Sequence, residues 1–242
     1  MTTTGFAFLL LIIAILSFGE PKALTSEPPS TPCVVGRTAA GIGFWTWPAN
    51  SHVNIYLREP DFSEADVSAI SVAVQNWDAT FMENGSNVRF YFHGLTRETK
   101  TSRGDLTIIR GAVYKKKLRH LALLEAHSLR NDQLIDYALI IVDAQVKDHE
   151  VLTNVMAHEL GHSLGLLDCY GCHGRSTAMG LLRSADESNG IEGPTACDKI
   201  AVLAAYQELK LHVRSAPAPQ ELNKILMDEG EEPEDDDTPI KP

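Results

Sequence analysis

The stretch His158–Asp168 constrains this chain more than any other feature, and it reads HELGHSLGLLD. On a helix, His158 and His162 project from the same face one turn apart, so both imidazoles can reach one metal ion. Gly165 can adopt the positive φ that ends a helix sharply, and the chain can then turn back to present Asp168. The stretch therefore predicts a helix and turn that carry three metal ligands.

The donor types indicate which metal is bound and what it does. Two imidazoles and one carboxylate, with a fourth position left for water, are typical of a catalytic zinc site. Glu159 lies beside the first ligand, where it can take a proton from a zinc-activated water. We therefore expect Zn²⁺ to be held by His158, His162 and Asp168, with Glu159 as general base. The alternative is a buried helix whose two histidines are hydrogen-bonded without any metal.

The third ligand has a rival in His173, which lies eleven residues after His162. The spacing from Gly165 to Asp168 suits the turn that follows the helix, so it favours Asp168. His173 is then a surface residue, or it replaces Asp168 as ligand. The remaining histidines have no ligand spacing: His52, His93, His120, His127, His149 and His212.

These residues resemble the signature of the metzincin zinc endopeptidases, and Ser176–Gly180 resembles the Met-turn of that family. Other stretches resemble the matrixin catalytic domain in the same order, over about residues 44–212. They are Trp47-Pro48, Val53–Leu57, Phe62–Asp66, Gly104–Ile108 and Gly193–Asp198. The resemblance implies an α+β zincin fold with a twisted mixed β-sheet, an active-site helix, a Met-turn and a C-terminal helix.

The chain also departs from the matrixin pattern. The third ligand of that family is usually His, whereas Asp168 resembles the snapalysin-like branch of metzincins. The His- and Asp-rich loop that holds the matrixins' structural zinc and calcium has no match, and neither does their Pro-Arg-Cys-Gly inhibitory segment. The resemblance makes Met179 an apolar floor beneath the histidines rather than a ligand.

The two ends of the sequence differ from its middle. Phe6–Phe18 is an apolar run that is short for a membrane span, and small residues and prolines follow it. We expect a signal peptide over residues 1–23, with an uncleaved membrane anchor as the alternative. A linker and N-terminal segment over 24–43, a catalytic domain over 44–212 and a disordered acidic tail over 213–242 would follow. The chain would then be secreted, either extracellular or periplasmic, as a monomer without stable membrane association.

The four cysteines, Cys33, Cys169, Cys172 and Cys197, suit an oxidising compartment. Three pairings are possible and the sequence does not choose among them; we favour Cys169–Cys172 with Cys33–Cys197. A redox or metal role for the Cys169–Cys172 pair is a second interpretation. A Cys33 thiolate that caps the zinc is a third.

The net charge of −11 is concentrated at one end. Residues 221–242 contain nine acidic residues and two lysines, a charge of −7, which leaves −4 for the rest. A nearly neutral body argues against a nucleic-acid partner, because phosphate binding needs a basic surface. The Pro-, Glu- and Asp-rich tail is expected to aid solubility, with weak calcium binding or a protein contact as alternatives.

Hydrophobic spacing predicts the order of elements. Alternation over 53–57 predicts a strand, and Ser63 with Asp66 forms a capping box at the start of a helix. Its core-facing residues are expected to be Val67, Ile70, Val74, Trp77 and Phe81. Further strands are expected at 88–92, 106–109 and 138–142, with helices over 152–164 and from Thr195, where Asp198 completes a second box. Residues 118–124 fit either a helix or an edge strand.

Together these features predict a secreted zinc endopeptidase that hydrolyses proteins or peptides. A catalytically weak metzincin-like protein-binding module is the main alternative, and a hydrolase of non-peptide substrates is another. An extended peptide could add as a strand at the edge formed by residues 121–125.

Overall fold

The computed structural model of this chain describes residues 32–43, 45–115, 118–129, 133–172, 176–180, 190–213 and 225–226. The expected signal peptide, His173 and most of the acidic tail lie outside the described residues. No helix in these ranges is long and apolar enough to cross a membrane.

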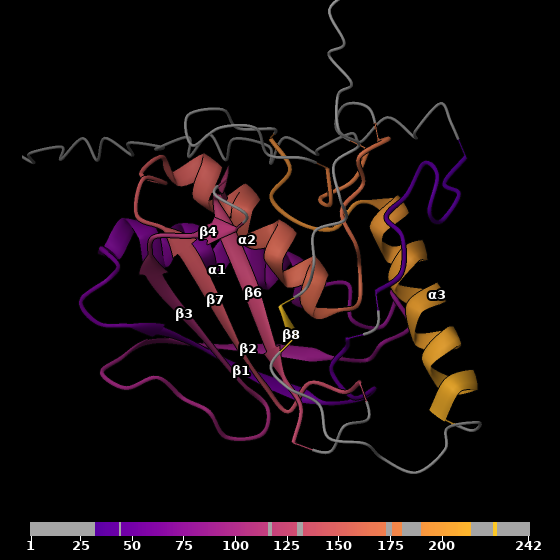
Figure 1. Ribbon diagram of the computed structural model, residues 1–242, viewed down its shortest axis with the longest axis horizontal. Coiled ribbons are helices and arrows are strands. Elements are labelled where there is room, and N and C mark those ends of the chain that lie inside the picture. Colours follow the sequence, from indigo (N-terminus) through magenta and orange to yellow (C-terminus); the bar gives the residue numbers. More distant parts are fainter. Residues whose placement is uncertain are drawn as a thin grey trace, which may run out of the picture. The chain divides into compact units, whose positions relative to one another are not determined.

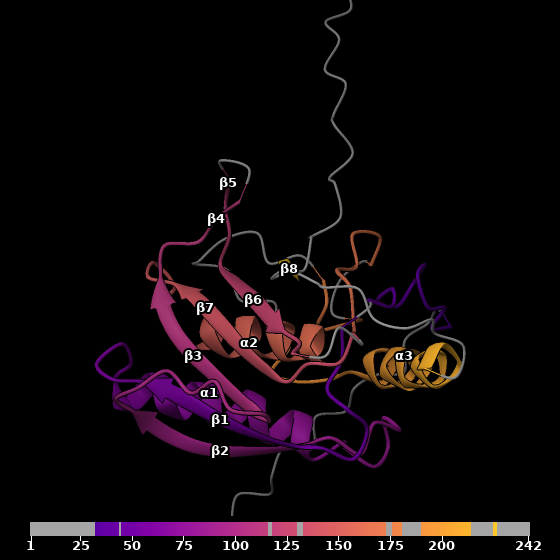
Figure 2. The ribbon, with the colours of Figure 1, turned by 60° about the horizontal axis from the view of Figure 1, so that its bottom comes forward.

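One mixed sheet organises the chain, in the order β2-β1-β3-β7-β6-β8 (Figure 1). Strands β2, β1, β3 and β7 run parallel, and β6 pairs antiparallel with both β7 and β8. The strands of this sheet are β1 (His52–Arg58), β2 (Arg89–Thr96), β3 (Asp105–Gly111), β6 (Ala122–His127), β7 (Tyr137–Asp143) and β8 (Ile225–Leu226). A short hairpin of β4 (Tyr114–Lys115) and β5 (Leu118–Arg119) projects from it (Figure 2).

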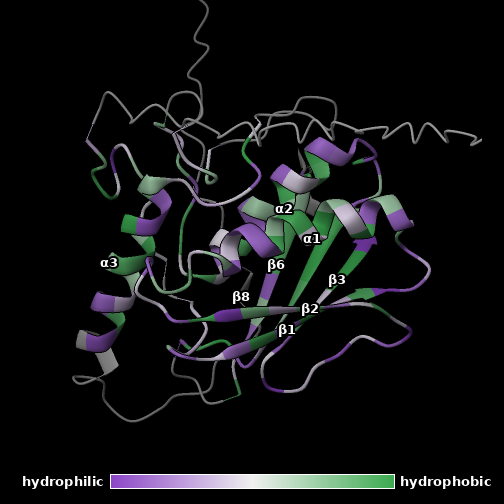
Figure 3. Cartoon of the chain, turned by 180° about the vertical axis from the view of Figure 1, so that it is seen from behind, coloured by the Kyte–Doolittle hydropathy of each residue, from purple (hydrophilic) through white to green (hydrophobic). Residues whose placement is uncertain are grey.

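Two helices cover the same face of the sheet, α1 (Glu64–Asp78) and α2 (His149–Ser163), while α3 (Ala196–Val213) lies off to one side (Figure 2). Hydrophobic and hydrophilic residues are interspersed along α1 and α2 (Figure 3). Ile70 and Val74 of α1 and Leu152 and Val155 of α2 belong to the buried core. A ring N–H of buried Trp77 on α1 donates to the carbonyl of Ala157 on α2, at 2.8 Å. Because Ala157 precedes His158, this bond helps to fix the part of α2 that carries the histidines.

Most of the expected elements are confirmed. The capping box of Ser63 and Asp66 is present, and Ile70, Val74 and Trp77 are buried. Phe81 and Val67 are only half-buried, and Phe81 lies beyond the end of α1. The ambiguous residues 118–124 form strands, because the apolar side chains of β6 pack against α2 and β7. The sheet is mixed, as expected, although most of its neighbouring strands are parallel.

Helix α2 begins three residues earlier than the hydrophobic spacing predicts. Asp148 caps it, since its carboxylate accepts hydrogen bonds from the backbone N–H groups of Glu150 and Val151 at 2.9 and 3.0 Å. The negative charge of this carboxylate also interacts favourably with the positive end of the helix dipole. The first turn is thus specified by a cap rather than by an apolar stripe.

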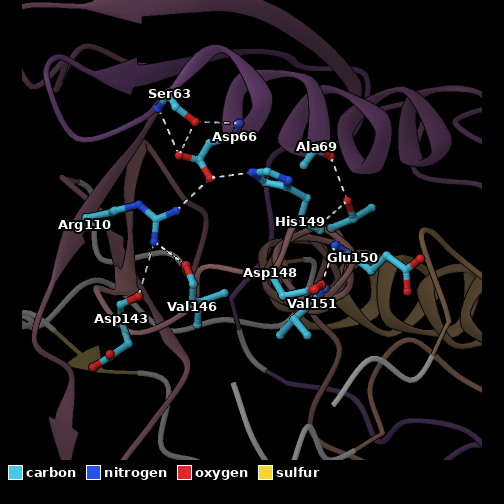
Figure 4. A network of polar contacts seen from close by, with 11 residues as sticks. Ser63, Asp66, Ala69, Arg110, Asp143, Val146, Asp148, His149, Glu150 and Val151 are labelled. Carbon is cyan, nitrogen blue, oxygen red and sulfur yellow. Dashed lines mark hydrogen bonds and ion pairs between the residues drawn. The ribbon is translucent and has the colours of Figure 1, made fainter. Parts of the chain in front are cut away.

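Asp66 is the centre of a polar network that joins the starts of both helices (Figure 4). Its Oδ2 accepts hydrogen bonds from the backbone N–H and the hydroxyl of Ser63, both at 2.9 Å. Its Oδ1 accepts from Arg110 at 3.0 Å and lies 3.6 Å from His149 Nε2. Arg110 also donates to the carbonyl of Val146, at 2.6 Å. The carboxylate therefore links β3 to the first turns of α1 and α2.

Replacing Asp66 with Ala should lower the free energy of unfolding by about 3 kcal/mol, because Arg110 would stay buried without its partner. Burial raises the pKa of Asp66, but hydrogen bonds from Ser63 and the charge of Arg110 outweigh it and hold the pKa below 3.8. The stabilisation is therefore present above that pH and disappears as the pH falls through the folded-state pKa.

Urea unfolding of wild type and Asp66→Ala at a series of pH values measures this. The difference in free energy of unfolding between wild type and Asp66→Ala should become smaller as the pH falls. Glu64→Ala, on the exposed side of the same turn, is the matched control and should change stability little. An equal loss in both variants would contradict the role of the network.

Candidate metal centre

Three ionisable side chains are buried within one turn of α2. His158, Glu159 and His162 are 7%, 4% and 6% exposed. Their nitrogen and carboxylate oxygen atoms lie within 4.8 Å of one another. Buried ionisable groups in a single cluster are costly unless they are paired or bind a metal, so the cluster marks a candidate functional site.

Two backbone carbonyls fix the protonation of both imidazole rings. Nδ1 of His158 lies 3.0 Å from the carbonyl oxygen of Ala178, and Nδ1 of His162 lies 2.8 Å from that of Leu166. A carbonyl oxygen can only accept, so each Nδ1 carries the proton and donates it. The Nε2 atom of each neutral ring is then left with a lone pair, which is the arrangement found for metal-binding histidines.

Asp168 meets both of these nitrogens, as the sequence predicts. Its Oδ1 lies 2.9 Å from His158 Nε2 and 3.5 Å from His162 Nε2, and its side chain is 4% exposed. Ligands about 2.0 Å from a tetrahedral zinc are roughly 3.3 Å apart, which falls between these two distances. Although Oδ1 is this close, neither ring aligns a hydrogen bond with it. Three acceptor atoms thus converge on one point, and the set fits a Zn²⁺ ion.

The electrostatics agree with the geometry. Burial lowers the pKa of His162, but the carboxylate of Asp168 outweighs burial and raises this pKa to about 9. The same carboxylate raises the pKa of His158 against the effect of burial. Burial would raise the pKa of Asp168, yet the two imidazoles hold it well below its usual range. The site therefore stabilises positive charge, which a divalent cation supplies without protons.

The other carboxylate oxygen of Asp168 has a partner of its own. Oδ2 accepts a hydrogen bond from the hydroxyl of Tyr170, at 3.4 Å. This bond orients the carboxylate so that Oδ1 faces the imidazoles. Tyr170 acts here on a ligand, a role that the sequence did not reveal.

The turn after α2 delivers Asp168 to the histidines. Gly165 has a φ of +87°, and a Cβ there would meet the methyl group of Thr46, so a larger residue would be strained in two ways. The backbone of Gly43 donates to the Gly165 carbonyl at 2.7 Å, and that of Leu167 donates to Gly41 at 3.0 Å. The N-terminal segment therefore packs on this turn and holds it in place.

Both disulfides match the pairing that we favoured, Cys33–Cys197 and Cys169–Cys172. The second closes the loop directly after Asp168, and the backbone of Cys169 donates to the carbonyl of Met179 at 2.8 Å. The metal role for Cys169 and Cys172 and the thiolate role for Cys33 are not what the structure shows, because all four sulfur atoms are bonded in disulfides.

The turn at Ser176–Gly180, which resembles a Met-turn in sequence, packs against α2. Met179 is fully buried, and a Cβ added to Gly161 would collide with its sulfur atom. Glycine between the two histidines therefore allows close approach of the turn. This contact is the physical reason for a glycine in the middle of a helix, where it would otherwise cost about 1 kcal/mol.

Asp198 of α3 holds the turn from the other side, which the sequence did not reveal beyond the capping box. It is fully buried and accepts hydrogen bonds from the hydroxyl of Thr177 and from the backbone N–H of Ala178, the latter at 2.8 Å. Burial raises its pKa, although these hydrogen bonds and those from Thr195 act in the opposite direction. The carbonyl of Ala178 also accepts the Nδ1 proton of His158. Asp198 therefore contacts the residue that orients the His158 ring.

A cavity of about 470 Å³ opens beside the donor atoms. Its lining includes Leu123 and Leu124 of β6, Asp168 and Tyr170 of the loop after α2, Glu159 and His162 of α2, and Arg37 of the N-terminal segment. The site is therefore accessible to a ligand larger than water.

No family model matches the sequence, and no curated protein matches it. Among solved structures, the crystal structure of archaemetzincin from Methanopyrus kandleri is similar. The TM-score is 0.42 and the identity 14%, over 70% of this chain and 98% of that chain. A likeness of this extent carries no functional argument, so the function of the site has to be argued from its own geometry.

Replacing Gly161 with Ala should displace Met179 and destabilise the protein by about 2 kcal/mol, since an added methyl group overpacks the core. Met179→Ala alone should also destabilise, because it leaves a cavity. The double variant should be more stable than the sum of the two losses predicts, because the smaller side chain makes room for the new methyl. Thermal unfolding of the four proteins measures this, and strict additivity would show that the two residues do not touch.

Proposed function

We propose that this chain is a secreted zinc endopeptidase of metzincin-like fold, with His158, His162 and Asp168 as ligands. The observation that carries the proposal is the convergence of three acceptor atoms next to a buried Glu159 and a cavity. A satisfied pair of core histidines would not need a carboxylate that faces both Nε2 atoms. The two disulfides support export to an oxidising compartment.

The residues divide the chemistry among them. Bound Zn²⁺ would supply Lewis-acid activation of water and of the peptide carbonyl. Glu159 takes the proton of the attacking water and returns it to the leaving amine. The carbonyls of Ala178 and Leu166 hold a proton on Nδ1 of each imidazole, so that each ring presents its Nε2 to the metal. Tyr170 keeps Oδ1 of Asp168 turned to the same point.

A peptide is the substrate that the surroundings favour. Strand β6 (Ala122–His127) overlaps the expected peptide-binding segment, residues 121–125, and its Leu123 and Leu124 line the cavity. A strand at a sheet edge offers backbone N–H and C=O groups to an extended chain, which gives affinity without a particular sequence. A metzincin-like binding module without catalysis is disfavoured by Glu159, which a binding role would not require.

The first test is proteolysis of a denatured protein mixture by the purified, oxidised, zinc-loaded protein. We expect cuts that disappear in Glu159→Ala while its zinc content stays equal to that of wild type. Mass spectrometry of the products gives the cleavage sites. Folded wild type that binds zinc and makes no cuts would favour the binding module or a hydrolase of other substrates.

The ligand assignment has its own test. Asp168→Ala should lose zinc, because two imidazoles alone bind it far more weakly, and His173→Ala should retain it. Metal analysis after gel filtration gives the stoichiometry of each variant. The reverse outcome would make His173 the third ligand. Asp168→Asn keeps the shape of the side chain but not its charge, and should bind zinc with intermediate affinity.

A further inference from the structure

The edge of the sheet at β6 is already paired with another part of the chain. Strand β8 lies antiparallel to β6, with Leu226 opposite Glu125 and Ile225 opposite Ala126 (Figures 1 and 2). The two partners come from positions about a hundred residues apart in the sequence. β6 is thus flanked by β7 on one side and by residues near the end of the sequence on the other.

The paired residues differ in composition from their surroundings in the sequence. Ile225-Leu226-Met227 is the one run of three successive apolar residues within residues 214–242, which are otherwise dominated by Pro, Asp, Glu and small residues. β-branched and large aliphatic side chains are the ones that pair well on a sheet. These three residues therefore have the composition of a β-strand, whereas the rest of residues 214–242 has the composition of a solvent-exposed chain.

The register of this pairing places β8 next to the part of β6 that lines the cavity. On β6, the residues next to those paired with β8 are Leu124 and Leu123, and both line the cavity beside Glu159 and His162. A peptide that pairs in the β8 register and continues in the same direction reaches Leu124 and then Leu123. Such a peptide would therefore run along the side of the cavity that also contains Glu159 and His162. The edge that β8 occupies and the path of an extended substrate are the same.

We propose that residues 225–226 act as an intramolecular competitor of the peptide substrate, so that β8 must leave β6 before a substrate strand can pair there. This rests on the proposed peptidase function of the site. The tether makes the competitor local, because a linked segment has an effective concentration in the millimolar range. Pairing over two residues involves few hydrogen bonds, each with a modest net contribution, so a substrate can displace it.

A competitor of this kind raises KM and leaves kcat unchanged. The test is made in the full chain, with Ile225 and Leu226 both replaced by Pro, which removes the N–H groups and opposes strand pairing. The matched control replaces Asp236 and Asp237 by Pro, which adds the same residues within the acidic stretch. We expect KM for a cleaved peptide to fall about 5- to 30-fold in the first variant, with kcat unchanged, and neither to change in the control.

A second measurement does not depend on catalysis. In the Glu159→Ala background, a fluorescent peptide with the sequence of residues 221–228 should bind about 5- to 30-fold more tightly to the proline variant than to the full chain with its native tail. Hydrogen exchange at the amide of Ala126 should rise in the proline variant and fall again when the peptide is added. Exchange at Glu125, whose amide lies on the side of β7, should not change. Absence of cleavage with these binding changes intact would refute the peptidase and leave the competitor in place.

Two results would overturn the proposal. Equal KM and equal peptide affinity in both proline variants would show that β8 does not compete with peptides. Aggregation of the first variant without a change in peptide affinity would show that β8 only covers an exposed sheet edge, a common protection against edge-to-edge association.

Discussion

Three acceptor atoms that face one another in a buried pocket are the constraint on which the rest of this structure depends. Two imidazole lone pairs and a carboxylate oxygen repel unless positive charge lies between them. Each ring already donates its Nδ1 proton to a carbonyl, so the positive charge has to come from a proton on Nε2 or from a cation. A divalent cation would supply this charge without protons, and we expect metal binding and folding to be coupled at this point.

The surrounding elements each fix one part of that pocket. Trp77 fixes the helix just before the first histidine, and Asp198 fixes the turn whose carbonyl orients that histidine. Gly161 and Met179 set the distance between helix and turn. Geometry at a metal centre has to be held within about half an ångström, and packing on all sides achieves this better than ligands alone.

The sequence predicted which residues come together at the candidate site, but not which residues hold them in place. Spacing alone brought His158, Glu159, His162 and Asp168 together, because helical periodicity and one glycine turn determine their positions locally. The roles of Asp198 and Tyr170 depend on contacts between distant or irregular segments, for which a sequence carries no periodic signal. The strand β6 was ambiguous for a related reason: a short apolar run suits a helix as well as a strand until its neighbours in the sheet are known.

The disulfide between Cys33 and Cys197 has a consequence for the folding of the sheet and the candidate site. It spans 164 residues, so nearly every element of the sheet and both ligand-bearing segments lie inside one covalent ring. Closing a ring of this size removes about 5 kcal/mol of chain entropy from the unfolded state on the loop-closure model. A reduced chain loses that advantage before any metal arrives. Reduction of this disulfide would therefore make assembly of the pocket less favourable by about that amount.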